Sequence, residues 1–214
     1  MNILSYISPI RLYRVVTKHN SILEVFEVAG RIQLFLDGFP QSNKAYLRDW
    51  RTILTRAKVS DLSPQSKVLL LGLGGGNVIT LLRSLLNDAS YTAIELEPEV
   101  VRVAQKYFGI GEFPKLQIVV RDAASFIHDN RTDFDLIVVD LYSGDDIPTF
   151  VSSNKFLKGL SSSLRVQGKV IINYASHNFK SQDFAKFEKA LSKHVTLVTQ
   201  LKTWGHTYYL ASNS

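Results

Sequence analysis

The 214-residue sequence contains no cysteine, which excludes disulfide bonds and thiolate metal sites. It also lacks an uncharged apolar run of roughly 18 residues, so a membrane-spanning helix is not expected. Residues 1–16 have no basic leader, long apolar block or small-residue cleavage site of the kind that marks a secretory signal peptide. We therefore expect a cytoplasmic protein.

What the sequence does contain is typical of a globular domain, with 45% apolar and 21% charged residues. The net charge of +6 permits an anionic partner such as nucleic acid. However, the basic residues are dispersed, so a mildly basic surface without a specific partner is the more ordinary interpretation. The histidines show no metal-ligand spacing, and we expect neither a metal nor a membrane contact.

The N-terminal part, residues 1–60, is predicted to form a β-hairpin followed by a helix. Ile32, Leu34 and Leu36 alternate with other residues after an Ala-Gly turn, which predicts a hairpin over residues 21–40. Apolar positions then recur at helical spacing over residues 42–57. The first 20 residues carry weak signals.

Residues 61–214 are predicted to form a second domain in which strands and helices alternate. The predicted strands are 68–72, 91–95, 116–120, 135–140 and 169–174. The predicted helices are 77–87, 97–107, 122–129, 150–164 and 180–192. Near-continuous apolar strands suit a mostly parallel sheet with helices on both faces, which is an α/β fold. Residues 195–212 predict an antiparallel hairpin at the sheet edge, giving seven strands in all.

A glycine-rich loop follows the first of these strands, in the stretch "KVLLLGLGGGNVITLL". Glycine lets a backbone approach a ligand closely, and the first strand-to-helix loop of an α/β sheet usually carries a ligand contact. The N–H groups of the following helix favour an anion. The residues predicted to bind a nucleotide here are Gly72, Gly74, Gly75, Gly76 and Asn77, the last as a candidate helix cap.

Three acids stand at the ends of the next strands and support this interpretation. Glu95 comes about twenty positions after the loop, where an acid can accept hydrogen bonds from ribose hydroxyls. Asp122 follows the third strand, where its carboxylate or the adjoining backbone can meet an adenine amino group. Asp140 ends the fourth strand and faces the same crevice. For each acid alone, capping a helix or simple solvation is an equal alternative.

Taken in order, these segments resemble the spermidine/spermine synthase family over residues 22–175. The similarity is carried by "LDGFPQS", "VLLLGLGGGN", "AIELEPEVV", "VVRDAASF", "FDLIVVD" and "LRVQGKVIIN". It implies a Rossmann-like fold of the class I S-adenosylmethionine-dependent methyltransferases, with a small N-terminal β-hairpin region. It also implies an S-adenosyl nucleotide as group donor, a small-molecule acceptor such as a polyamine, and a homodimer supported by the hairpin.

The resemblance also implies roles for particular residues. Glu95 would hold the ribose, Asp122 and Ala123 the adenine, and Asp140 the incoming nucleophile. The predicted contacts with the acceptor are Gln41, Tyr142, Asp145 and Tyr174. For both tyrosines, packing beneath a loop is the more ordinary interpretation.

The sequence departs from the family at acids that would bind cations. The aminopropyltransferases carry an acid inside the glycine loop, in a G-G-G-D-G-G pattern, and this sequence has Gly75 there. A second acid, three residues beyond the catalytic one, is replaced by Ser143, although Asp145 follows closely. An acidic pair before the first helix is replaced by Asn43 and Lys44.

These departures bear on which donor is used. Decarboxylated S-adenosylmethionine ends in a cationic amine and needs an acid near the loop. Ordinary S-adenosylmethionine has a carboxylate, which backbone N–H groups at a helix N-terminus suit. We therefore predict methyl transfer from S-adenosylmethionine to a small amine or similar nucleophile, with Asp140 orienting the nucleophile and accepting its proton.

Three alternatives remain at this level. One is a polyamine aminopropyltransferase that uses decarboxylated S-adenosylmethionine. Another is a non-catalytic protein that binds a nucleotide or a partner. A third is a nucleic-acid methyltransferase that contacts phosphates through the basic residues of the 42–57 helix and its end, Arg48, Arg51, Arg56 and Lys58.

Overall fold

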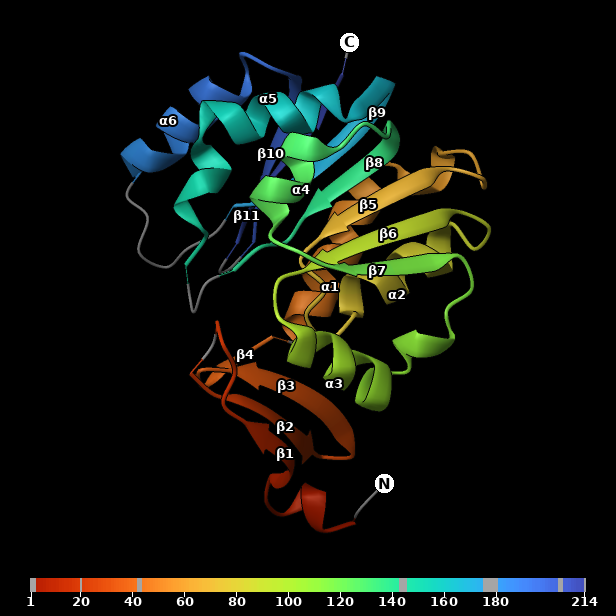
Figure 1. Ribbon diagram of the computed structural model, residues 1–214, viewed down its shortest axis with the longest axis vertical. Helices are drawn as coiled ribbons and strands as arrows, with labels where there is room; N and C mark the ends of the chain where they lie inside the picture. The colour runs from red at the N-terminus through yellow and green to blue at the C-terminus, as the bar shows by residue number, and fades with distance from the viewer. Residues whose placement is uncertain are drawn as a thin grey trace.

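A computed structural model of the chain describes residues 3–19, 21–41, 44–142, 146–174, 181–203 and 206–213. The described chain forms two sheets, a small one near the N-terminus and a large one covered by helices (Figure 1). Short 3₁₀ helices lie at Ile3–Tyr6, Val59–Asp61, Ile110–Glu112 and Thr149–Ser152.

The small sheet is antiparallel and its strands follow one another in chain order. They are β1 (Ile10–Val15), β2 (Leu23–Val28), β3 (Arg31–Leu36) and β4 (Phe39–Pro40). The predicted hairpin is confirmed as β2 and β3, joined by a turn in which Ala29 and Gly30 both have positive φ, as tight hairpin turns require. Strand β1 was not predicted, because its residues are partly or fully exposed and it lacks an apolar alternation.

The large sheet has seven strands in the order β10-β11-β9-β8-β5-β6-β7. These are β5 (Lys67–Leu71), β6 (Ser90–Glu95), β7 (Leu116–Val120), β8 (Phe134–Val139), β9 (Leu164–Asn173), β10 (Thr196–Lys202) and β11 (Thr207–Ser212). Strands β5 to β9 pair in parallel, whereas β11 is antiparallel to both of its neighbours. The predicted α/β fold, with its Rossmann-like parallel sheet and antiparallel C-terminal hairpin, is confirmed.

Helices cover both faces of this sheet (Figure 1). They are α1 (Lys44–Arg56), α2 (Asn77–Leu85), α3 (Pro98–Phe108), α4 (Ala123–Asp129), α5 (Asn154–Ser162) and α6 (Ser181–Leu191). Successive strand residues point to opposite faces, so Val68 and Leu70 pack with α1 and α2, while Leu69 and Leu71 pack with α4, α5 and α6. This double burial explains why the strands are apolar throughout.

Two predicted boundaries differ from the structure by more than two residues. The predicted helix 150–164 is a 3₁₀ turn followed by α5, because Ser153 interrupts it and its side chain accepts a hydrogen bond from the Phe156 N–H as an N-cap. Strand β9 starts at Leu164, five residues earlier than predicted, and its pairing with β8 shifts register after Phe134.

The small sheet and α1 make different contacts with the rest of the chain. Leu23, Val25 and Leu34 of the small sheet pack against Val100 and Val103 of α3. In contrast, α1 buries its apolar face in the core of the large sheet. Thus α1 packs with the second part of the chain, although it was grouped with the first, and the domain division at residue 60 stays a prediction. Among the described helices, none combines the length and apolar character needed to cross a bilayer.

Strands β5 and β8 are neighbours, yet the chain visits β6 and β7 between them, so the strand order reverses at this pair. Ligands of such sheets bind at the carboxyl ends of the strands beside this reversal. Here Gly72 follows β5 with φ +92°, and a Cβ atom on it would lie 2.1 Å from the backbone oxygen of Asp140 after β8. Glycine is therefore required at this point of the sheet.

We expect Gly72→Ala to lower the free energy of unfolding by about 3 kcal/mol or more beyond the effect of Gly38→Ala. Gly38 is a matched control, because it also has positive φ, at +83°, but nothing lies within 4 Å of its Cβ position. Urea unfolding followed by tryptophan fluorescence measures both. If both variants lose the same free energy of unfolding, the close approach of the Asp140 backbone to Gly72 does not determine the cost of the added Cβ atom.

Candidate functional site

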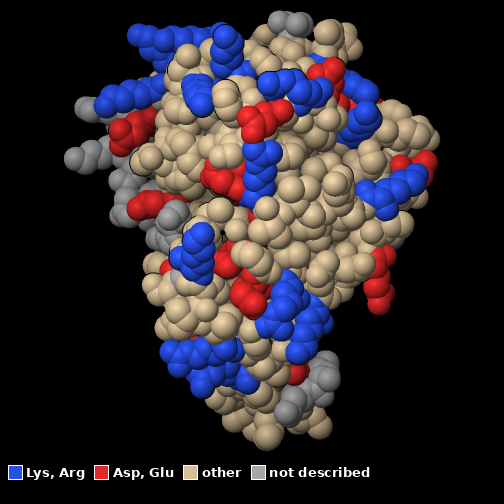
Figure 2. Space-filling model, in the orientation of Figure 1, with Lys and Arg blue, Asp and Glu red and all other residues tan. Residues whose placement is uncertain are grey.

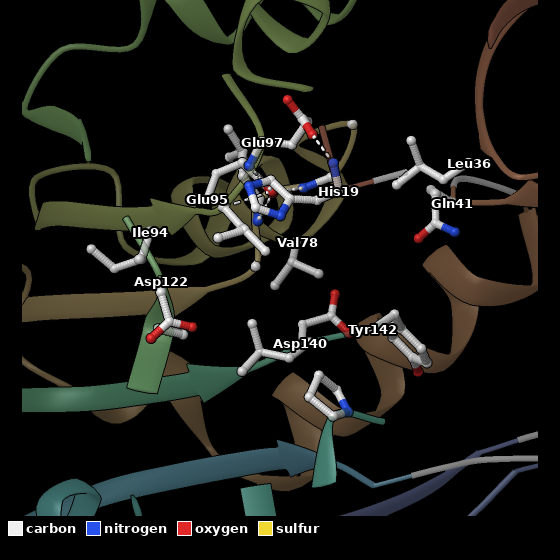
Figure 3. A pocket seen from close by; sticks show the side chains of 18 of the residues that line it. His19, Leu36, Gln41, Val78, Ile94, Glu95, Glu97, Asp122, Asp140 and Tyr142 are labelled. Atoms are coloured by element: carbon white, nitrogen blue, oxygen red, sulfur yellow. Dashed lines mark hydrogen bonds between the residues drawn. The ribbon is translucent and has the colours of Figure 1, made fainter. Parts of the chain in front are cut away.

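A cavity of about 310 Å³ opens at the carboxyl ends of the parallel strands. Its walls come from the loops after β5, β6, β7 and β8, and from the small sheet through His19, Leu36 and Gln41 (Figure 3). The size falls within the usual range of small-molecule sites, about 300–1,000 Å³. The cavity therefore lies at the carboxyl ends of the strands, which is where the sequence predicted a ligand site.

The glycine loop forms one wall of the cavity. Gly72, Leu73, Gly74 and Gly75 line it, as does Asn77 behind them. Gly76, which was predicted as a contact, is outside the lining. It is the N-cap of α2, with φ 78°, and Asn77 is the first helical residue rather than the cap. This corrects the predicted capping role of Asn77.

Gly75 occupies the loop position at which the resemblance leads one to expect an acid. A Cβ atom there would lie 3.2 Å from the ring of Phe108, at the end of α3. That distance is shorter than most Cβ contacts, so a larger side chain would require the Phe108 ring to move. At this position the loop carries no charge, and the Phe108 ring leaves little room for a side chain.

Glu95 ends β6 and lies in the cavity wall beside the glycine loop. One carboxylate oxygen accepts hydrogen bonds from the backbone N–H groups of Leu73 (3.1 Å) and Gly74 (3.3 Å). The other accepts from the N–H groups of Leu96 (2.8 Å) and Glu97 (3.1 Å). Burial raises the pKa of Glu95, and the four N–H groups oppose that rise. Glu95 therefore holds the glycine loop against β6, and a ribose hydroxyl bound there would share these oxygens.

Asp122 lies in the cavity wall on the side away from Gln41 and Leu36 (Figure 3), and Ala123, the first residue of α4, also lines the cavity. Its carboxylate accepts a hydrogen bond of 2.7 Å from the Ser125 N–H and so caps α4. The capping alternative raised for this residue thus applies in the structure. The predicted contact with adenine stays a prediction, and the placement of both residues in the cavity wall agrees with it.

Asp140 lies at the end of β8, in the cavity wall, with hydrogen-bond donors on both of its carboxylate oxygens. The Tyr46 hydroxyl of α1 donates to Oδ2, and the Asn173 amide at the end of β9 donates to Oδ1 at 3.0 Å. Burial raises the pKa of Asp140 to about 6, although these two hydrogen bonds act to lower it. Burial and the charge of Asp140 raise the pKa of Tyr46 well above its usual value, so the phenol stays protonated and donates.

Asn173 links Asp140 to two further side chains. Its amide nitrogen also donates to the Tyr142 hydroxyl at 2.6 Å, and its amide oxygen lies 3.2 Å from His206 Nδ1. The Tyr142 hydroxyl and His206 Nδ1 are 3.0 Å apart. Asp140, Tyr46, Asn173, Tyr142 and His206 therefore form one polar network, which we call the Asp140 network. Such an arrangement fixes the carboxylate of Asp140 and places a group with a pKa of about 6 at the cavity wall.

The predicted acceptor contacts have different places in the structure. Gln41 and Tyr142 line the cavity. Tyr174 is outside the lining and only 3% exposed, with its ring stacked on Phe187 at 3.7 Å and its hydroxyl 2.9 Å from Ser152 Oγ. The packing alternative therefore applies to Tyr174. Asp145 lies outside the described residues.

Three members of the Asp140 network were not predicted, and one of them had a usable signal. Asn173 is a polar residue at the carboxyl end of an apolar strand, so the rule that identified Asp140 also applies to it. Tyr46 is one helical turn before Trp50 on the apolar side of α1, where it looks like a core residue. His206 reaches the site only through the pairing of β11 with β9, which local sequence does not specify.

Comparison with known proteins places this site in a family. The spermine/spermidine synthase domain model matches residues 51–212 of the chain. The chain belongs to this family. The family relationship predicted from the sequence is thereby confirmed, and the match includes the glycine loop and the acids Glu95, Asp122 and Asp140.

The sequences of relatives with two different activities match parts of this chain. A polyamine aminopropyltransferase of Neisseria meningitidis is 28% identical over 148 residues, which are 69% of this chain and 55% of the relative. The eEF1A lysine and N-terminal methyltransferase homolog of Drosophila pseudoobscura is 32% identical over 84 residues, which are 38% of this chain and 12% of the relative. The chain thus spans about half the length of the matched aminopropyltransferase.

The fold agrees with this membership. The crystal structure of the spermidine synthase from Thermotoga maritima superposes with a TM-score of 0.76, at 19% identity, over 95% of this chain and 73% of that one. The likeness includes nearly all of the chain, so it extends to the small N-terminal sheet as well as to the large one.

The Asp140 network generates a prediction about pH. We expect Tyr46→Phe to raise the pKa of Asp140 above 6 by about one unit or more, because it removes a hydrogen bond to the charged carboxylate. A carboxyl-carbon NMR titration of wild type and variant measures the shift.

Tyr13→Phe provides the matched control, since Tyr13 bonds Glu99 rather than Asp140. An unchanged Asp140 titration in the Tyr46 variant would contradict the hydrogen-bond assignment. A shift of equal size in both variants would contradict it too.

Proposed function

We propose that this chain is a transferase that uses an S-adenosyl donor, and that it transfers a methyl group from S-adenosylmethionine to a small amine or similar nucleophile. The observation that carries the choice of donor is the neutral, closely packed glycine loop at Gly75. Membership of the family supports the nucleotide, and the methyltransferase among the relatives supports the reaction type.

The residues present fit such a donor. Glu95 would hold the ribose, and Asp122 and Ala123, after the neighbouring strand β7, would bound the base. When bound, the donor supplies an electrophilic carbon next to its sulfonium. The protein contributes alignment, since a displacement requires the nucleophile, carbon and leaving sulfur in line.

Asp140 is the residue we assign to the acceptor. Its network fixes the carboxylate at the cavity wall, where it can orient an amine and take up the proton that the amine loses. A pKa of about 6 keeps the carboxylate charged at neutral pH while making it a better base than an ordinary aspartate. Gln41 and Tyr142 would bound the acceptor on the side of the small sheet and of the network.

Aminopropyl transfer from decarboxylated S-adenosylmethionine is the second candidate, and the polyamine aminopropyltransferase among the relatives favours it. The lack of an acid at Gly75 argues against it, because the cationic tail would lose a charge-assisted hydrogen bond. Such a loss weakens binding by about tenfold to a hundredfold.

Two further readings have less support. A nucleic-acid substrate would contact the exposed residues Arg48, Arg51, Arg56 and Lys58 of α1 and its end. Basic residues are dispersed along the chain rather than gathered in one block, and on the face drawn in Figure 2, which the sheet separates from α1, they also form separate groups with acids between them. A non-catalytic role would not explain why a buried carboxylate, Asp140, is held by two hydrogen bonds at the cavity wall. A homodimer through the small sheet, suggested by the family, stays a prediction.

The donor can be tested directly. We expect calorimetric titration of the wild-type protein to give tighter binding of S-adenosylmethionine than of its decarboxylated form, by about tenfold or more. Tighter binding of the decarboxylated form would replace methyl transfer with aminopropyl transfer. Failure to bind either nucleoside would favour the non-catalytic alternative.

The role of Asp140 can be tested once a panel of amines has been screened for label transfer from S-adenosylmethionine. We expect Asp140→Asn to lower turnover by about a hundredfold or more, because the base is lost. Donor affinity should stay within about twofold, since Asp140 is assigned to the acceptor. We also expect wild-type turnover to fall below pH 6 as Asp140 becomes protonated. Full turnover in the Asn variant would exclude Asp140 as the base.

A further inference from the structure

His206 directly precedes β11, and both its backbone and its ring are held in place. Its carbonyl oxygen accepts a hydrogen bond of 2.8 Å from the Thr203 N–H, across the C-terminal hairpin. Three tyrosine rings surround the imidazole, with centroid distances of 5.8 Å, 6.3 Å and 6.0 Å for Tyr46, Tyr142 and Tyr208. The imidazole is therefore an ordered part of the Asp140 network.

The orientation of the Asn173 amide follows from its contact with Asp140. A charged carboxylate only accepts hydrogen bonds, so the atom of Asn173 that lies 3.0 Å from Asp140 Oδ1 is the amide nitrogen. The amide oxygen of Asn173 then lies 3.2 Å from His206 Nδ1. Because an amide oxygen is an acceptor only, this contact is a hydrogen bond when Nδ1 carries a proton.

The contact between His206 and Tyr142 agrees with a proton on Nδ1. The Tyr142 hydroxyl lies 3.0 Å from Nδ1 and accepts a hydrogen bond of 2.6 Å from the Asn173 amide nitrogen. If Tyr142 instead donated to an unprotonated Nδ1, the lone pair of that nitrogen would face the Asn173 oxygen, and two acceptors would lie 3.2 Å apart. With a proton on Nδ1, both contacts join a donor to an acceptor.

We propose that His206 is a positioning residue for Asp140: with its proton on Nδ1, it holds the Asn173 oxygen and so keeps the amide nitrogen turned toward the carboxylate. The inference rests on the proposed function, in which Asp140 is the base. Once Asp140 has taken up a proton, its carboxyl group can donate as well as accept, and it no longer determines which end of the amide faces it. His206 then keeps the amide in place for the next turnover.

The protonation of His206 can be measured without a substrate. A neutral imidazole carries its proton on one of its two nitrogens. We expect nitrogen NMR of the wild-type protein, with His206 neutral, to place this proton on Nδ1, and the loss of the same signals in His206→Asn identifies them. A proton on Nε2 would overturn the inference, whether or not the proposed function holds.

Two variants separate the hydrogen bond from the ring. His206→Phe keeps an aromatic ring among the tyrosines but removes the donor. His206→Asn removes the ring, but its amide nitrogen can occupy the place of Nδ1. We expect His206→Phe to raise the pKa of Asp140 above 6 by about half a unit or more, because the Asn173 amide is no longer held toward the carboxylate. His206→Asn should recover at least half of that shift, as measured by carboxyl-carbon NMR titration.

Turnover provides a second measurement once an accepted amine is known. We expect His206→Phe to lower turnover by about tenfold, with donor affinity within about twofold of wild type, since His206 acts on Asp140 through Asn173. His194→Phe is the matched control, because His194 Nε2 also lies on an asparagine oxygen, 2.8 Å from Asn154 Oδ1, but outside the cavity lining. Thermal unfolding of each variant verifies that it is folded.

The outcomes separate the two proposals. If His206→Phe leaves the pKa of Asp140 unchanged, the positioning role is wrong and the proposed function stands. If His206→Asn shifts this pKa as much as His206→Phe does, the role is also wrong, because the ring rather than the donor then matters. If the shift and its recovery occur but Asp140→Asn keeps full turnover, His206 does position the carboxylate, and the proposed role of Asp140 fails.

Discussion

The site depends on one close contact between two backbones. Strands β5 and β8 stay paired to their last residues, where the N–H of Asp140 donates to the Leu71 carbonyl at 2.8 Å. On the other side, the N–H of Gly72 donates to the Ile94 carbonyl of β6 at 2.9 Å. Only the missing side chain of Gly72 lets the Asp140 carbonyl fit beside it. The glycine loop and the Asp140 carboxylate both leave the sheet from this point, so their separation is set by main-chain geometry.

Glu95 and Asp140 show how the same edge of the sheet gives two carboxylates different tasks. Burial raises the pKa of both. Glu95 is held by four N–H groups, which are fixed parts of the backbone, and in return it fixes the loop. Asp140 is held by two side chains from distant segments. A carboxylate held by side chains can exchange one partner for a substrate more readily than one that braces a loop.

Much of the fold could be predicted from the sequence, because it depends on local signals. Apolar runs gave the strands, and helical periodicity gave the helices. The same signals were weak for β1, whose residues are partly or fully exposed, and for the break before α5, where the cap of Ser153 overrides the apolar pattern.

The site was predictable only in part. Asp140 and Glu95 could be found because they follow parallel strands, whose ends must meet at one edge. Tyr46 comes from α1, and His206 directly precedes β11, the second strand of the C-terminal hairpin. Their approach to Asp140 depends on how α1 packs across the sheet and on the register of β11, neither of which a single sequence encodes locally. Tyr174 comes directly after Asn173, the last residue of β9. Its side chain points into the core, because neighbouring residues of a strand alternate between the two faces of the sheet.

The order of strands in the large sheet has a consequence for how the protein is made. Strand β11 lies between β9 and β10, although the ribosome produces it after both. While the chain is growing, β10 therefore lacks the neighbour with which it pairs, and β9 presents an open edge. Strand β11 must enter between two strands that precede it in the chain and bring His206 to Asn173. The Asp140 network is therefore complete only when β11 has paired with β9, because His206 directly precedes that strand.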